Sequence, residues 1–160
     1  MDFVVEKDEG PIPYVLSQIL DTCVTGITLS DPDQPDNPIV YANAGFERVT
    51  GYHRKDILGR NCRFLHGDDR DQEGLDEVRE AIAAQRSATV TLRNYRRNGE
   101  LFWNRFTIQP LTDREGRLIY FLGIQYDVTA EVRADREVER LKALLGDTLG
   151  PEDDARGPLR

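Results

Sequence analysis

Three long segments rich in β-branched and aromatic residues constrain the fold more than any other feature of this sequence. They read SATVTLRNYRR (87–97), ELFWNRFTIQP (100–110) and RLIYFLGIQYDVT (117–129). The turn sequences NG (98–99) and DREG (113–116) separate them, and short turns of this kind join neighbouring strands. The sequence therefore predicts three consecutive β-strands linked by hairpin turns.

The first half of the sequence predicts two shorter strands and a group of helices. Apolar residues from Ile12 to Cys23 recur at the spacing of one helix face, which places Cys23 in the core. Residues 26–30 and 39–43 predict a pair of strands with a turn-rich loop between them. Residues 44–84 contain no β pattern and break at several glycines, so short helices are expected there. The last of these helices is longer and has an apolar face formed by Leu75, Val78 and Ile82.

Each of the three later strands places one amide side chain on a face that is otherwise apolar. Side chains alternate between the two faces of a strand, so every second residue belongs to one face. By this count Asn94 shares its face with Val90 and Leu92, Asn104 with Phe102, Phe106 and Ile108, and Gln125 with Ile119 and Phe121. A buried amide without a partner costs roughly 1–3 kcal/mol. The amides therefore pair with one another or with backbone, or they bind a flat heteroaromatic ligand whose edge alternates donors and acceptors.

The charge of the chain narrows the classes of partner. The formal net charge is −8, which argues against general binding to nucleic acid or to an anionic membrane surface. The sequence contains no run of about 18 apolar residues, the length that a membrane span requires. The acidic N-terminus also lacks the apolar core of a secretory signal. Two cysteines are too few for a disulfide framework and lack zinc-ligand spacing, so no metal site is expected. These features predict a cytoplasmic protein whose partner is a protein or a small molecule.

One of the two cysteines, Cys62, lies in the stretch NCRFLHGDDR (61–70). Asn61 is suited to cap the helical turn that carries this cysteine. Arg63 follows it, and Arg79 falls on the polar side of the helix further along the chain. Arginine's planar fork suits a phosphate group. The two arginines therefore either bind an anionic tail of the ligand or lie at the surface among carboxylates.

The segment GRNCRFLHG resembles the GxNCRFLQ motif of the light-oxygen-voltage (LOV) photoreceptors, a branch of the PAS domains. The resemblance extends from about Gly26 to Thr129 through PDNPIVYAN, LRNYRRNGELFWN and YFLGIQYDVT. It implies an α+β protein with the PAS fold, a five-stranded antiparallel sheet with short helices that enclose a flavin, plus flanking N- and C-terminal helices. The implied division of the chain is an N-terminal helical cap (1–25), a flavin-binding core (26–129), a C-terminal helix (130–146) and a flexible tail (147–160).

The resemblance also implies a function, that of a blue-light photosensor which binds flavin mononucleotide (FMN) and is not an enzyme. Cys62 is then the thiol that bonds reversibly to the flavin, and Gln125 is the amide that relays the change to the C-terminal segment. Arg63 and Arg79 would hold the phosphate. The full set of implied flavin-binding residues is Asn37, Asn61, Arg63, Leu65, His66, Arg79, Asn94, Asn104, Phe106, Ile108 and Gln125.

His66 departs from the family motif, which commonly ends in glutamine. A neutral imidazole donates a hydrogen bond through only one nitrogen, whereas a charged one donates through both. A histidine in an ordinary environment titrates at about 6.5. We therefore expect flavin binding to persist, with a pH dependence near that value.

Two other interpretations of these residues stay open. Cys62 and His66 are four residues apart, so a helical turn would bring them to one face as the nucleophile and base of a thiol enzyme. Alternatively, the chain is a PAS module that binds another ligand or only a protein partner. A yellow protein with a three-peaked blue absorption band would exclude the enzyme, and a chain that stays colourless with flavin would favour the other module.

A short apolar seam among charged residues marks the C-terminal segment. Its members are Ala134, Val138, Leu141 and Leu145. Their 4, 3, 4 spacing corresponds to about one and a half heptads, which is too short to dimerise firmly alone. The seam predicts either a helix docked on its own sheet or a contact in a homodimer, with a downstream signalling protein as a further partner.

Overall fold

The structure, a computed structural model, describes residues 13–148. The chain divides into two compact units, one that ends at Val128 and one that begins at Thr129. Positions 1–12 of the expected N-terminal cap and positions 149–160 of the expected tail lie outside the described residues. The division into cap, core, helix and tail stays a prediction.

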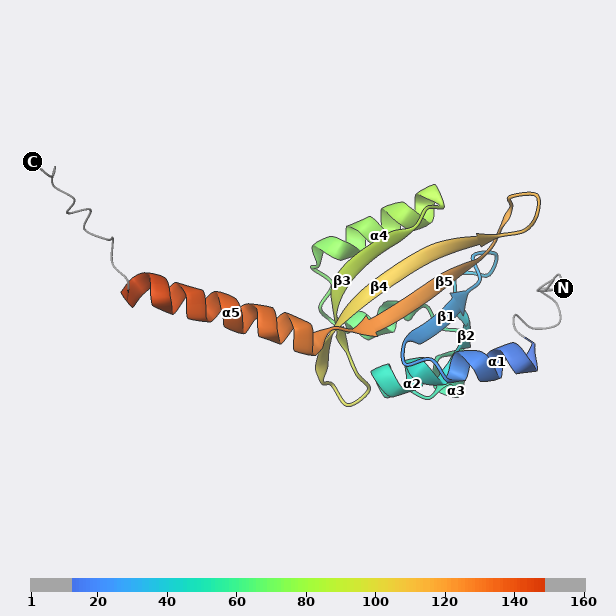
Figure 1. Cartoon of the computed structure of the whole chain (residues 1–160). Coiled ribbons are helices and arrows are strands. Elements are labelled where there is room, and N and C mark those ends of the chain that lie inside the picture. The colour runs from blue at the N-terminus through green and yellow to red at the C-terminus, as the bar shows by residue number, and fades with distance from the viewer. Residues whose placement is uncertain (1–12, 149–160) are drawn as a thin grey trace, which may run out of the picture. The chain divides into compact units, whose positions relative to one another are not determined.

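A five-stranded antiparallel sheet in the order β2-β1-β5-β4-β3 forms the first unit (Figure 1). Its strands are β1 (Gly26–Ser30), β2 (Ile39–Ala42), β3 (Ala88–Tyr95), β4 (Leu101–Thr112) and β5 (Leu118–Asp127). The last strand lies at the centre, where Gln125 is opposite Gly26 of β1 on one side and opposite Phe106 of β4 on the other. The predicted α+β class and five-stranded sheet are confirmed.

The alternation of the later strands determines which side chains enter the core. Asn94, Asn104 and Gln125 are each 1% exposed, while Arg105, next to Asn104, is exposed. The turn between β3 and β4 needs Gly99, because its φ of 87° lies in the left-handed region that other residues disfavour. The sheet therefore has one face that is apolar except for three amides.

Short helices connect β2 to β3, as predicted. They are α2 (Ala44–Thr50), α3 (Arg54–Ile57), the 3₁₀ helix η1 (Cys62–His66) and α4 (Glu73–Ala84). The side chain of Asn61 accepts a hydrogen bond from the backbone N–H of Arg63 at 3.0 Å, which confirms the predicted cap of η1. In Figure 1, α4 runs along the sheet beside β3.

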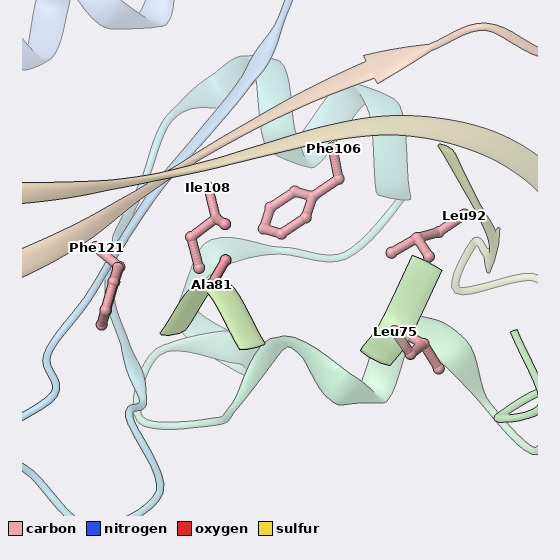
Figure 2. Packing of buried hydrophobic residues seen from close by; sticks show 6 residues of the cluster. All are labelled: Leu75, Ala81, Leu92, Phe106, Ile108 and Phe121. Atoms are coloured by element: carbon pink, nitrogen blue, oxygen red, sulfur yellow. The ribbon is translucent and has the colours of Figure 1, made fainter. Parts of the chain in front are cut away.

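Two apolar clusters hold the first unit together. One lies between α4 and the sheet and consists of Leu75, Ala81, Leu92, Phe106, Ile108 and Phe121 (Figure 2). The other lies under α2, α3 and η1 and consists of Ile39, Ala42, Phe46, Ile57 and Leu65. Burying one such side chain contributes about 1.5–3 kcal/mol. The two clusters fix α4 and η1 on the same side of the sheet, which positions the site described below.

Helix α1 (Tyr14–Asp21) does not bury the apolar face that the sequence suggests. Val15 and Ile19 are 65% and 56% exposed, and Cys23 is half-buried, so the prediction that Cys23 belongs to the core is wrong. Polar contacts dock this segment instead. The side chain of Asn43 donates a hydrogen bond to the carbonyl of Leu20 at 2.8 Å. The backbone N–H of Ala44 donates to the carboxylate of Asp21 at 2.7 Å.

The second unit contains helix α5, which spans Thr129–Thr148. Val138 and Leu141 of the predicted seam are 48% and 46% exposed on this helix. Within residues 13–148, no helix combines the length and apolarity that a membrane crossing needs.

Candidate functional site

A cavity of about 270 Å³ opens between α4, η1 and the sheet. Apolar side chains form its walls: Ile39, Leu75, Val78, Ile82, Phe106, Ile108 and Phe121. Its polar lining consists of Thr28, Ser30, Asn37, Asn61, Cys62, Arg63, His66, Arg70 and Arg79. Such a mixture of apolar walls and a few polar groups is typical of a small-molecule site.

A smaller hollow of about 30 Å³ lies at the amide-bearing part of the sheet. It shares Cys62, His66 and Phe106 with the large cavity, so the two are neighbouring parts of one site. Leu65, Asn94, Asn104 and Gln125 line this part. Every residue that the resemblance implies for flavin binding therefore lines one of the two hollows, although their roles stay predictions.

The amides at the closed end are only partly satisfied. Asn104 donates to the side-chain oxygen of Asn94 at 2.9 Å, and Gln125 has a weak contact to the hydroxyl of Thr28 at 3.4 Å. The side-chain oxygens of Asn104, Gln125 and Asn37 are buried and have no hydrogen-bond partner within residues 13–148. Each unpaired oxygen costs roughly 1–3 kcal/mol. The site therefore presents buried acceptors to a ligand that carries N–H or O–H donors, as the edge of a flavin and its hydroxylated chain do.

Gly123 keeps space open beside Gln125. A Cβ atom at this position would lie 2.5 Å from the hydroxyl oxygen of Thr28 and 3.1 Å from the ring of Phe106. Glycine thus allows the amide of Gln125, the hydroxyl and the ring to meet on the cavity floor. Thr28, Ser30 and Gly123 are lining residues that sequence reasoning did not assign to the site, because the neighbours of a strand's amide depend on the register of β1 against β5.

Three arginines line the large cavity and are exposed to solvent. Arg63 pairs with Asp36 at 2.5 Å and Arg79 with Asp76 at 2.5 Å, and both arginine side chains are more than half exposed. Among the described residues, Arg70 has one hydrogen bond, of 3.4 Å, to the carbonyl of Gly67. Sequence reasoning missed Arg70, although it lies within the same NCRFLHGDDR stretch. The site is therefore buried and amide-lined at one end and cationic at its mouth.

Cys62 lines both hollows, and the residue is half-buried. Burial raises the pKa of the Cys62 thiol, and Arg63 opposes that rise only in part. The thiol is thus held protonated at neutral pH. An enzyme nucleophile needs the opposite, a lowered pKa or a hydrogen-bonded base. The structure gives no support to the thiol-enzyme interpretation.

His66 lies in a more restrictive environment than the sequence suggests. It is 9% exposed, and its Nδ1 is 3.0 Å from the amide nitrogen of Asn94. Burial lowers its pKa below the ordinary value of 6.5, and the nearby cations Arg70 and Arg63 lower it further. The pKa of His66 is therefore lower than the sequence suggested, because the neighbours that lower it are brought near only by the fold.

A polar clamp holds the loop between η1 and α4 against β3. Arg93 donates to both carboxylate oxygens of Asp69, at 2.7 and 2.8 Å, and the hydroxyl of Tyr95 donates to the same carboxylate at 2.8 Å. Gln72 accepts from the backbone N–H of Arg93 at 2.7 Å and donates to its carbonyl at 2.9 Å. The clamp fixes the loop that carries Arg70.

We expect the Asp69→Asn protein to be less stable than wild type at neutral pH, by an amount that becomes smaller in acid. The hydrogen bonds from Arg93, and then from Tyr95, lower the pKa of Asp69 from 3.8 to about 2. A carboxylate with a depressed folded-state pKa stabilises the fold above its unfolded pKa, and this stabilisation is lost as the pH falls from about 4 towards 2. Denaturant unfolding at pH 6 and pH 2.5 measures the difference. Asp68→Asn, at an exposed neighbour, is the control, and an equal difference at both pH values would contradict the role of the charge.

Comparison with known proteins places this geometry in a family. The family model described as PAS domain matches residues 24–130. A blue-light photoreceptor of Listeria innocua is 44% identical over 126 residues, which are 79% of this chain and 49% of that protein. Phototropin-2 of Oryza sativa is 46% identical over 112 residues, which are 70% of this chain and 12% of that protein. This chain thus spans about half the length of the first relative and much less of the second.

A solved structure of a protein described as an RNA-binding light-oxygen-voltage receptor is also similar. It superposes with a TM-score of 0.77 at 36% identity, over 92% of this chain and 41% of that one. The family model matches most of the chain, and the relatives include photoreceptors. Both findings fit the observed fold and its cavity lined by Cys62. The chain belongs to the PAS domain family and is a light-oxygen-voltage domain of its photoreceptor branch.

Proposed function

We propose that this protein senses blue light through FMN bound in the cavity. The observation that carries the proposal is the polarity of the site, with buried acceptor oxygens of Asn104 and Gln125 at its closed end and arginines at its mouth. A flavin has a matching polarity, because the N–H of its ring system would meet the amides and its phosphate would meet the arginines. The apolar walls would pack against the ring faces.

The flavin supplies the absorption of blue light, and Cys62 supplies the reversible bond. The Cys62 thiol would add across the C=N bond at the centre of the excited ring system, with its sulfur bonding to the carbon and its proton moving to the nitrogen. No other reactant is consumed, and reversal in the dark restores the thiol. The raised pKa of the Cys62 thiol suits this step, because the proton that the nitrogen receives is already on the sulfur.

Gln125 is the residue proposed to report the bond to the rest of the chain. The side chain of Gln125 has both a donor and an acceptor, so it could respond if proton transfer changed a nearby flavin nitrogen from an acceptor to a donor. Gln125 lies two residues before the end of β5 at Asp127, and α5 begins at Thr129. Only a few residues of sequence therefore separate this amide from the start of the C-terminal helix, so a reorientation of the amide would occur next to that segment.

Reconstitution with different flavins tests the choice of FMN. Stripped protein should bind FMN more tightly than riboflavin, because only FMN carries the phosphate that Arg63, Arg70 and Arg79 would hold. Added salt should narrow this difference. Equal affinities would remove FMN as the specific ligand, and a protein that stays colourless with every flavin would favour a PAS module for another ligand.

The output is proposed to pass through a homodimer and from there to a signalling protein. Val138 and Leu141 expose apolar surface on α5, which a helix in water normally buries. The protein of Erythrobacter litoralis named blue-light-activated histidine kinase 1 is 46% identical over 121 residues, only 34% of its length. For this chain, the net charge of −8 continues to argue against nucleic acid as the partner.

We expect Leu141→Glu to weaken the dimer by at least about tenfold. Loss of one buried leucine side chain costs roughly 1.5–3 kcal/mol, and each 1.4 kcal/mol corresponds to a factor of ten in affinity. Ala143→Glu adds the same charge on the opposite side of α5 and should change affinity little. Light scattering across a concentration series, in the dark and in blue light, makes the comparison. A wild-type chain that is monomeric throughout would rule out the dimer.

A further inference from the structure

The orientation of the buried Asn94 amide determines how its neighbours His66 and Asn104 can form hydrogen bonds. The side-chain nitrogen of Asn94 donates to the backbone carbonyl of Arg93 at 2.9 Å, and its oxygen accepts from Asn104 at 2.9 Å. If the amide were turned over, its oxygen would face the carbonyl oxygen of Arg93, and its nitrogen would face the nitrogen of Asn104. Two acceptor oxygens would then face each other at Arg93, and two donor nitrogens would face each other at Asn104, so both hydrogen bonds would be lost. The backbone of β3 therefore fixes which way Asn94 points.

The fixed amide determines the state of the His66 ring. The second N–H of Asn94 is directed to Nδ1 of His66 at 3.0 Å, so Nδ1 must be the acceptor. The ring proton then resides on Nε2, which has no hydrogen-bond partner among the described residues. His66 therefore offers a single donor to the cavity that it lines.

The same chain of bonds determines what Asn104 offers. Because the nitrogen of Asn104 is directed to Asn94, its oxygen is left as a buried acceptor without a partner. Asn104, Asn94 and His66 thus form one hydrogen-bonded series. A change at His66 would therefore alter the orientation of the Asn104 side-chain oxygen, the acceptor at the opposite end of the series.

We infer that His66 is a positioning residue that makes ligand retention depend on pH, because only its neutral ring with the proton on Nε2 fits the amide series. Protonation would put an N–H on Nδ1, opposite the N–H of Asn94. Either the ring moves away or the Asn94 amide turns, and both break the series that orients Asn104. The inference rests on the proposed function, in which the cavity holds a flavin.

The charges around His66 set the direction of this dependence. Arg70, Arg63 and Arg79 face the ring and oppose its protonation, and Asp69 alone favours it. Burial acts in the same direction as the arginines and is the largest influence, so the pKa of His66 lies below 6.5. Ligand binding is therefore expected to be constant above about 6.5 and to weaken as the pH falls further.

The glutamine of the family motif would lack this property. A primary amide has no titratable proton in this range and can turn either its oxygen or its nitrogen towards Asn94. His66→Gln should therefore lose less FMN affinity than wild type between pH 7.5 and pH 5, because only the phosphate of FMN, whose second pKa is about 6, then gains a proton. His53→Gln is the matched control, because His53 is the other histidine of the sequence and lies exposed beside Glu47 at 3.5 Å.

The test is FMN dissociation from the loaded protein, followed by flavin fluorescence between pH 8 and pH 4.5. In the wild type and in His53→Gln, the dissociation constant of FMN should rise as the pH falls. The total rise that His66 causes should be about tenfold for each unit by which the pKa of His66 is lower in the FMN-bound protein than in the free protein. In His66→Gln the rise should be smaller, limited to the part that protonation of the FMN phosphate causes. Equal pH profiles for wild type and His66→Gln, both yellow, would overturn the inference and leave the proposed function intact. A wild type that binds no flavin would instead overturn the proposed function.

A second measurement does not require the His66→Gln protein to fold. In His53→Gln, His66 is the remaining histidine, so its ring nitrogens can be identified directly by ¹⁵N magnetic resonance. At pH 7.5 the flavin-loaded protein should show a neutral ring with the proton on Nε2. A charged ring, or a proton on Nδ1, would contradict the hydrogen-bond series.

Discussion

Cys62→Ala should bind FMN as wild type does and lose reversible bleaching in blue light entirely. The polar contacts proposed for the ligand come from the amides and arginines, so removal of the sulfur leaves binding in place. The covalent step, by contrast, has no other thiol within the cavity. The expected difference is therefore all or none, whereas most single substitutions change a property by a few-fold.

The other cysteine provides the control for this experiment. Cys23 is half-buried after α1, contacts the carbonyl of Ile19, and is not among the cavity-lining residues. Cys23→Ala should bleach and recover like wild type. Absorption between 400 and 500 nm, during illumination and then in the dark, records both proteins. Bleaching and thermal recovery of Cys62→Ala at the wild-type rate would show that another group forms the bond.

Gln125→Leu should separate bond formation from output. The substitution keeps the size of the side chain but removes the amide that is proposed to respond to the ring nitrogen, so Cys62 should still form its bond. The absorption band should shift, because a hydrogen bond to the ring is lost. The response of α5 to light should be strongly reduced, since the cavity amide nearest in sequence to the start of that helix no longer detects the proton transfer.

Hydrogen exchange of α5 in dark and light measures this second prediction. Gln109→Leu is a suitable control, because it makes the same chemical change on the exposed side of β4. An unshifted spectrum together with a full response of α5 in Gln125→Leu would place the relay elsewhere. The oxygen of Gln125 is buried without a partner, so its removal is not expected to destabilise the ligand-free protein.

Strand periodicity predicted the most important part of the site. The alternation along β4 places Asn104 among Phe102, Phe106 and Ile108, and the structure buries all four side chains. This worked because the side chains of a strand have a period of two, independent of the rest of the fold. The cap of η1 by Asn61 is similarly local, because it depends on residues two positions apart.

The properties that the sequence did not reveal depend on contacts between distant segments. Cys23 seemed buried because α1 has an apolar face, but hydrogen bonds to α2 dock this segment and leave Ile19 exposed. The pKa of His66 is set by burial and by arginines that only the fold brings near. Arg70 was missed for the same reason, because an arginine in a charged loop gives no sign that it borders a cavity.

The central claim is that Cys62 bonds reversibly to a flavin held in this cavity, and one measurement on the wild-type protein tests it most directly. The absorption spectrum is recorded in the dark, after a blue-light pulse, and again during incubation in the dark. We expect a yellow protein whose three-peaked blue band disappears on illumination and returns fully without added reductant or substrate. A flavin-loaded protein whose blue band is unchanged by light would contradict it.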